Sequence, residues 1–230
     1  MRDALSTNGL NVEAQLKVIN EGGSLSTGTN GGNPAITVSG ADAVTLIFAC
    51  GTDYKMELPN FRGEDPHKAV TARIDAAAKK GYEALKADHI ADHSALFSRV
   101  ELGFDEEIPQ IPTDELIKKY RNMIENNGGD IPTSAEQRAL EIMCYQFGRY
   151  LTIAGSRDGA LPTNLQGVWG EGWFTWYGDY HFNINVQMNY WPTMASNLSE
   201  CMKPYNDLLN VLKQAGLSLI HISEPTRLRR

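Results

Sequence analysis

Residues 161–192 read LPTNLQGVWGEGWFTWYGDYHFNINVQMNYWP and contain all four tryptophans of the chain. Amide, imidazole and carboxylate side chains stand between the aromatic ones. Flat aromatic rings cover the apolar faces of a sugar, while amides and imidazoles replace the hydrogen bonds that its hydroxyl groups lose with water. The stretch therefore predicts a carbohydrate site. The competing interpretation is a tryptophan-rich core segment, against which stands the rarity of buried amides without partners.

Helical patterns flank this stretch and predict that it is a long loop between helices. On its N-terminal side, Thr133-Ser-Ala-Glu136 reads as a capping box, and the following helix is expected to end at Gly155. The apolar stripe of that helix consists of Leu140, Cys144, Phe147, Leu151 and Ala154. On the C-terminal side we expect a helix from about Asn185, interrupted by Pro192, and another over residues 203–216.

The region before residue 133 changes from a strand pattern to a helical one. Residues 10–58 alternate apolar and polar side chains, with an apparent turn at Gly28 to Asn33, and predict the last strands of an antiparallel domain. Helices are expected from Asp65-Pro66, with Gly81 separating two of them, and again from Thr113.

Composition excludes several classes of protein. With 42% hydrophobic and 21% charged residues the chain can bury a core, and its net charge of −7 argues against nucleic acid and anionic membranes as partners. No signal peptide is visible. Cofactors and metals are not expected, because His89 and His93 lack the glutamate of the zinc-protease pattern. The three cysteines, Cys50, Cys144 and Cys201, are expected to be buried thiols.

Several ordered motifs resemble glycoside hydrolase family 95, the inverting α-L-fucosidases, over roughly residues 10–216. They are Phe61–Pro66, Tyr145–Tyr150, Asn164–Trp169, Asp179–Asn185, Gln187–Pro192 and Asn197–Cys201. The resemblance implies a mixed fold, β then α: the end of an antiparallel β-sandwich domain in residues 1–62, a helical linker in 63–111 and the first helices of an (α/α)6 barrel in 112–216.

Residues 217–230 differ from the rest and resemble one reading frame of a sequencing adapter. We expect a non-native tail there, extended or loosely helical, in which Pro225 ends any helix. The alternative is a native helix that runs on from residues 208–214. The resemblance then implies a fragment of a longer protein. Periplasmic or extracellular placement would suit the full-length protein.

The resemblance also implies the roles of individual residues. Inverting glycosidases use two carboxyl groups, a general acid and a general base, and in this family two asparagines help to position the attacking water. They correspond to Asn183 and Asn185, whose spacing allows them to converge only outside a regular helix. The alternative for this pair is capping of the following helix, and both roles could coexist.

Further side chains are expected to contact the sugar. His181 could donate to a hydroxyl group and Asp179 could accept from one, although Asp179 would equally suit loop capping beside Gly178. Three tryptophans are candidate platforms that the sequence leaves unranked: Trp169, Trp176 and Trp191. Gln166 and Asn164 are expected to hold the loop.

The resemblance implies a hydrolase of terminal α-L-fucosyl linkages that acts on fucosylated oligosaccharides or glycans. The family's acid and base come from segments beyond Gly216, so Glu171 is not assigned as the acid and this chain is expected to be inactive alone. The alternatives are an α-L-galactosidase on the same scaffold and a non-catalytic carbohydrate-binding module.

Overall fold

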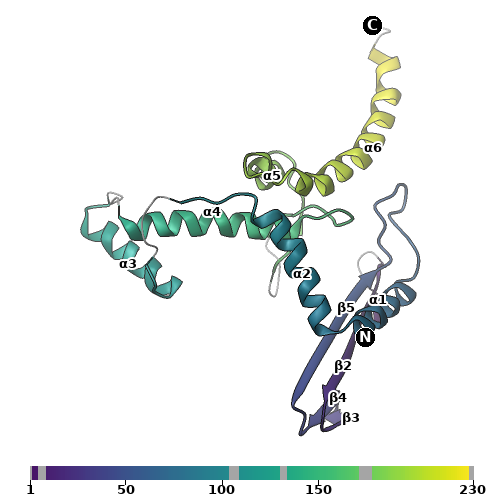
Figure 1. Ribbon diagram of the computed structural model, residues 1–230. Coiled ribbons are helices and arrows are strands. Elements are labelled where there is room, and N and C mark those ends of the chain that lie inside the picture. Colours follow the sequence, from purple (N-terminus) through teal and green to yellow (C-terminus); the bar gives the residue numbers. More distant parts are fainter. Residues whose placement is uncertain (1, 5–8, 104–108, 130–133, 171–177, 228–230) are drawn as a thin grey trace. The chain divides into compact units, whose positions relative to one another are not determined.

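The computed structural model describes residues 2–4, 9–103, 109–129, 134–170 and 178–227. The chain divides into two compact units, residues 1–91 and 92–230. Antiparallel strands come first along the chain and helices follow, as the colours of Figure 1 show. This order confirms the expected β-then-α arrangement.

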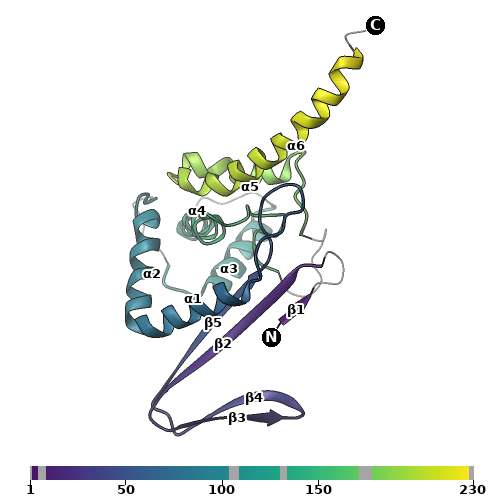
Figure 2. The ribbon, with the colours of Figure 1, turned by 90° about the vertical axis from the view of Figure 1, so that its right-hand side faces the viewer.

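The first unit contains a three-stranded antiparallel sheet in the order β1-β2-β5 and a two-stranded one, β3-β4. Figure 2 shows β2 and β5 as a long pair, with the β3-β4 hairpin at one end of it. The strands are β1 (Arg2–Ala4), β2 (Asn11–Glu21), β3 (Ser24–Asn30), β4 (Asn33–Ser39) and β5 (Ala43–Thr52). The alternation in β2 places the apolar Val12, Ala14, Leu16 and Val18 on one face and mostly polar residues on the other, because successive side chains of a strand point in opposite directions.

The turn expected at Gly28 to Asn33 is shorter than predicted. Strand β3 extends to Asn30, and only Gly31 and Gly32 connect it to β4. Both glycines have positive φ, 57° and 85°, which is what the tightest hairpin turns require. The glycine-rich composition predicts a turn at residues that belong to strand β3, where Gly28 pairs with Ala35.

Helix α1 (His67–Lys80) packs on one face of the β2-β5 pair through the buried Val70 and Ile74. The expected start is confirmed, because the Asp65 carboxylate accepts a hydrogen bond from the His67 backbone N–H at 2.9 Å. Gly81, at φ 82°, separates α1 from α2 (Tyr82–Phe97), as predicted. Asp65-Pro66 and Gly81 thus determine the two ends of α1.

The opposite face of the β2-β5 pair is apolar and exposed. Leu16 pairs with Phe48, and Val18 with Leu46, across the two strands. Leu46 and Phe48 expose 64% and 66% of their surface. Apolar side chains gathered on one face of a sheet normally meet a second layer.

The second unit is helical. After the end of α2 it contains α3 (Thr113–Asn126), α4 (Ala135–Gly155), α5 (Asn185–Ala195), the short 3₁₀ helix η2 (Ser199–Met202) and α6 (Lys203–Arg227). Its core is a cluster of buried side chains from α2, α4 and the segment around η2: Leu96, Ile153, Leu198 and Cys201. Starts at Thr113 and Asn185 and the end at Gly155 agree with the sequence pattern.

Three details of this unit differ from the expectations. Ser134, not Thr133, is the N-cap of α4, with its hydroxyl oxygen accepting from the Gln137 N–H at 3.2 Å; Thr133 lies outside the described residues. Cys144, Phe147 and Ala154 of the expected apolar stripe are exposed, because α4 packs through a neighbouring face. The Cys144 thiol is accordingly exposed, as is that of Cys50 in β5 of the first unit, and only Cys201 is buried.

Helix α6 continues past Gly216 to Arg227 and includes Pro225. The expectation that Pro225 ends the helix is therefore wrong.

A buried arginine holds the helices of the second unit together. Arg149 of α4 is only 2% exposed, and its guanidinium donates to backbone carbonyl oxygens of Leu96, Phe97 and Val100 at 2.9, 2.7 and 3.2 Å. Its Nε donates to the Ser196 carbonyl at 3.3 Å. The last carbonyls of a helix lack partners within it, so this one side chain caps both α2 and α5.

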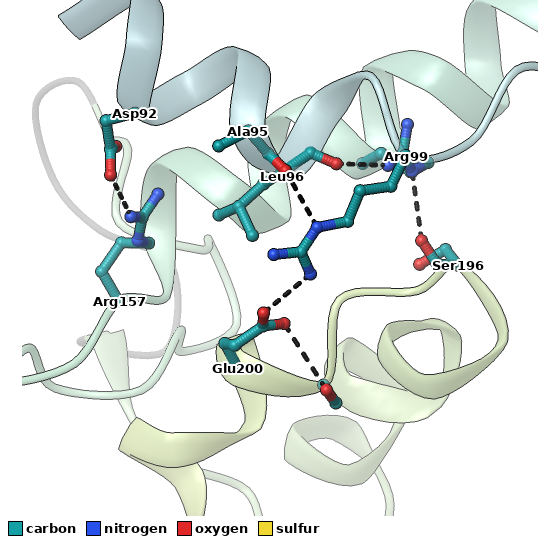
Figure 3. A network of polar contacts seen from close by, with 9 residues as sticks. Asp92, Ala95, Leu96, Arg99, Arg157, Ser196 and Glu200 are labelled. Atoms are coloured by element: carbon teal, nitrogen blue, oxygen red, sulfur yellow. Dashed lines mark hydrogen bonds and ion pairs between the residues drawn. The ribbon is translucent and has the colours of Figure 1, made fainter. Parts of the chain in front are cut away.

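Ion pairs surround this arrangement, as Figure 3 shows. Arg99 donates to the Ala95 carbonyl at 2.9 Å and to Glu200 at 2.7 Å, while Arg157 donates to Asp92 at 2.6 Å. Hydrogen bonding from its own backbone N–H, and then from Arg99, lowers the pKa of Glu200. The end of α2 is thereby tied to η2 and to the end of α4.

Replacing Arg149 by alanine is expected to lower the free energy of unfolding of the second unit by about 3–5 kcal/mol, because four carbonyl groups lose a buried donor. Urea denaturation followed by far-UV circular dichroism measures the change. Arg121→Ala on the exposed side of α3 is the matched control and should change stability little. A loss of under 1 kcal/mol for Arg149→Ala would contradict the capping role assigned here.

Candidate functional site

A tight turn begins the tryptophan-rich loop. The backbone groups of Asn164 and Gly167 exchange two hydrogen bonds, both of 3.0 Å, and Gly167 has φ 70°. The side-chain oxygen of Asn164 also accepts from the Gln166 N–H at 2.9 Å. Asn164 therefore holds this loop, as the sequence predicts, and sets the position of Gln166.

Tyr190 of α5 fastens the same loop to the helices. The Thr163 N–H donates to the Tyr190 hydroxyl at 3.0 Å, and the Tyr190 and Ser156 hydroxyls lie 2.8 Å apart. The Ser156 hydroxyl donates its hydrogen bond to the Cys201 carbonyl at 2.8 Å, so the Tyr190 hydroxyl must donate to Ser156. The Tyr190 ring also stacks on Tyr205 of α6 at 5.0 Å.

A second connection comes from the neighbouring position of α5. The Asn189 amide nitrogen donates to the Asn164 carbonyl at 2.8 Å. Two consecutive residues of α5 thus form hydrogen bonds with the turn and with the residue before it, and these bonds attach the turn to the helix.

The predicted asparagine pair lies at the mouth of α5, where the sequence placed it. Helix α5 begins at Asn185, and the Val186 N–H donates to the His181 carbonyl at 3.1 Å, which folds the preceding segment against the helix. The N-cap position is Ile184, and no side chain caps it. Within the described residues, the capping alternative for Asn183 and Asn185 is therefore not observed.

A cavity of about 400 Å³ lies at this helix mouth and is lined by Leu165, Gln166, His181 and Asn185. The structure therefore brings two of the predicted site residues, His181 and Asn185, together with the loop amide. Asn183 and Asp179 are exposed and do not line it.

A second cavity, of about 420 Å³, adjoins the same loop and shares Gln166 with the first. Trp169, Met188, Asn189 and Pro192 are among its lining residues. Trp169 is thus the predicted tryptophan that the structure places in a cavity. Trp191 is 63% exposed and lines neither cavity, and Trp176, like Glu171, lies outside the described residues.

Neither cavity is lined by a carboxylate from the part of the chain that the structure describes. No group of three metal-ligating side chains occurs among those residues either. The described lining of the two cavities offers hydrogen bonding and apolar contact, which suit the recognition of a polar ligand. In the same described part, no helix combines the length and apolarity needed to cross a membrane.

Sequence reasoning missed the roles of Tyr190 and Gly155. The sequence assigned no role to Tyr190, whose hydroxyl forms hydrogen bonds inside the fold. Gly155 was interpreted only as a helix end, whereas its missing side chain makes room for the ring of Trp169. Both roles depend on contacts between segments that the linear sequence does not place together.

Replacing Tyr190 by phenylalanine is expected to lower the free energy of unfolding by about 1–3 kcal/mol, because the Thr163 N–H loses its acceptor and Ser156 loses a donor. Thermal and urea denaturation measure the loss. Tyr205→Phe is the control, since the ring that stacks on Tyr190 has a hydroxyl without a hydrogen bond to the described residues. Equal effects of the two substitutions would contradict the role of the Tyr190 hydroxyl.

Comparison with known proteins places the chain in a family. Residues 81–221 match the family model of the Glycosyl hydrolase family 95 catalytic domain, a segment that ends a few residues beyond Gly216. The chain is 34% identical to "Probable alpha-fucosidase A" of Aspergillus niger over 205 residues, which are 85% of this chain and 24% of that protein. It is 32% identical to "Alpha-L-fucosidase 2" of Arabidopsis thaliana over 212 residues, 90% of this chain and 24% of the relative.

The chain thus spans about a quarter of the length of these curated relatives. Because the family model matches more than half of the chain, the chain belongs to glycoside hydrolase family 95.

Proposed function

We propose that the full-length protein is a glycoside hydrolase that cleaves terminal α-L-fucosyl linkages of oligosaccharides or glycans with inversion. One observation carries the proposal: in a chain of family 95, the mouth of α5 holds a cavity lined by His181, Asn185 and Gln166. Both relatives are named as α-fucosidases, which supports fucose as the sugar that is cleaved off.

Asn185 is proposed to orient the water that attacks the sugar. A side-chain amide suits this task, because its oxygen accepts a hydrogen bond from the water while its nitrogen donates to a carboxylate or a sugar hydroxyl. Asn183 is proposed as its partner, two residues earlier in the turn before α5. His181, in the same cavity as Asn185, would donate to a hydroxyl group of the sugar, and Asp179 would accept from one.

The general acid and general base are proposed to come from other segments of the full-length protein, beyond Gly216. The lack of carboxylates among the described residues of both cavities supports this assignment. An inverting hydrolase needs two carboxyl groups separated widely enough for a water molecule. The residues at the start of α5 would then orient the water, and carboxyl groups from those other segments would transfer the protons.

The finer fold is proposed on two exposed apolar surfaces. The face with Leu16, Leu46 and Phe48 is what one layer of a β-sandwich would present to its second sheet, with residues 1–62 as part of that domain. In α3 and α4, Ile117, Met143 and Phe147 line an apolar groove that further barrel helices would cover. Residues 63–111 would be the linker and 112–216 the start of the (α/α)6 barrel.

The purified 230-residue chain is expected to release no L-fucose from 2'-fucosyllactose above a buffer blank. General acid–base assistance contributes about 10²- to 10⁴-fold to such reactions, and no carboxylate among the described residues lines the cavities. Chromatography of the released sugar measures the reaction, with the full-length protein as the positive control. Turnover by the isolated chain would place a catalytic carboxylate inside it.

In the full-length protein, Asn185→Ala is expected to lower kcat much more than it raises KM, at a cost of about 2–3 kcal/mol in the transition state. Asn183→Ala should act in the same direction. Steady-state kinetics with 2'-fucosyllactose measures both, and Asn206→Ala on the exposed face of α6 is the matched amide control.

Three outcomes separate this proposal from its alternatives. A lower melting temperature with kcat retained would favour helix capping by Asn185. Binding of fucosylated glycans by the full-length protein without any turnover would favour a carbohydrate-binding module, and faster cleavage of an α-L-galactoside than of the matching α-L-fucoside would favour the other specificity.

A further inference from the structure

The ring of Trp169 packs against two glycines, Gly155 and Gly167. A Cβ atom added at Gly155 would lie 3.3 Å from Cη2 of Trp169, and one added at Gly167 would lie 3.0 Å from Cε3. The six-membered part of the indole ring therefore rests against two bare backbone positions, one at the end of α4 and one in the Asn164 turn. Contact with two elements holds the ring in one orientation.

The seated ring remains available to a ligand. Trp169 is 44% exposed, and it lines the cavity of about 420 Å³ together with Met188 and Pro192 of α5. A ring that is immobilised on one side and open on the other loses little conformational freedom when a ligand stacks on it. An apolar ring face of this kind matches the C–H face of a pyranose.

Polar groups lie at the edge of the same cavity. The Asn189 amide nitrogen is used on the Asn164 carbonyl, while its oxygen accepts no hydrogen bond from the described residues. That oxygen can accept from a sugar hydroxyl. The cavity thus combines one aromatic platform with a polar group of fixed position, which is how sugar sites reconcile apolar contact with hydroxyl recognition.

The cavity adjoins the site proposed for the cleaved sugar. Gln166 lines both cavities, one with His181 and Asn185 and the other with Trp169. Two neighbouring cavities that share one amide can hold two consecutive sugars of one chain.

We propose that the Trp169 cavity binds the pyranose ring of the leaving group, the sugar to which the cleaved fucose is attached. This inference rests on the proposed function for the identity of the first sugar. Trp169 stacks on the apolar face of the second ring, Asn189 accepts from one of its hydroxyls, and Gly155 acts through Trp169 as a positioning residue. A second ring bound here would favour oligosaccharides over simple fucosides.

The test compares two substrates of the full-length protein, 2'-fucosyllactose and α-L-fucosyl fluoride, which has no second sugar. In Trp169→Ala, the ratio of kcat/KM for 2'-fucosyllactose to that for the fluoride is expected to fall about tenfold, mostly through KM. Gly155→Ala should lower the ratio in the same direction, because the added methyl group displaces the ring. Trp169→Phe should keep most of it.

Tyr82→Ala, which removes an exposed aromatic ring from α2 that lines neither cavity, is the control and should leave the ratio unchanged. An unchanged ratio in Trp169→Ala, or a fall in Trp191→Ala alone, would overturn the proposal. If Gly155→Ala fails to fold, the two Trp169 variants still decide.

A binding measurement separates this proposal from the proposed function. Lactose, the leaving group of 2'-fucosyllactose, is titrated into the full-length protein and into Trp169→Ala, with saturation-transfer NMR as the readout. About tenfold weaker lactose binding in the variant is expected whether or not the protein hydrolyses the fluoride. Equal lactose binding by both proteins would refute the subsite, and hydrolysis of neither substrate by the unmodified protein would refute the proposed function alone.

Discussion

The second unit depends on one buried guanidinium. Among the described residues Arg149 has no carboxylate partner; it donates to the backbone carbonyl groups of Leu96, Phe97, Val100 and Ser196 and to the side-chain oxygen of Gln146. A charge buried in this way is tolerated only when its donors meet acceptors, so α2, α4 and the end of α5 must come together in one arrangement. Its planar fork of donors suits this task, which a lysine could not perform with one ammonium group.

The position of α5 then determines the site. Arg149 caps the C-terminal end of this helix, while Tyr190 and Asn189 in its middle hold the loop that precedes it. Asn185 stands at its N-terminal end and lines the cavity with His181. Because one rigid helix carries all these contacts, a change at its far end would shift the amides at its mouth.

Local sequence signals predicted the helix boundaries well, because they act over a few residues. Proline after Asp65 and the positive φ of Gly81 define α1 without reference to the rest of the chain. The same rules failed where two local solutions compete: serine and threonine both cap helices, and only the structure selects Ser134. The burial of Arg149 and the contact of Trp169 with Gly155 depend on segments far apart in the sequence, so no local pattern indicates them.

Three of the predicted site residues, His181, Asn185 and Trp169, line cavities, but they are divided between two of them. The sequence grouped the tryptophans with the amides as one constellation, whereas the structure separates His181 and Asn185 from Trp169, with Gln166 between them. The reason is the turn from Asn164 to Gly167, which reverses the chain within four residues and directs Trp169 back toward Gly155. Under the proposed function, recognition of the second sugar would lie on one side of Gln166 and positioning of the reacting groups on the other. Binding energy gained around Trp169 would then support orientation at Asn185, since contacts remote from the reacting centre help to hold it in a productive geometry.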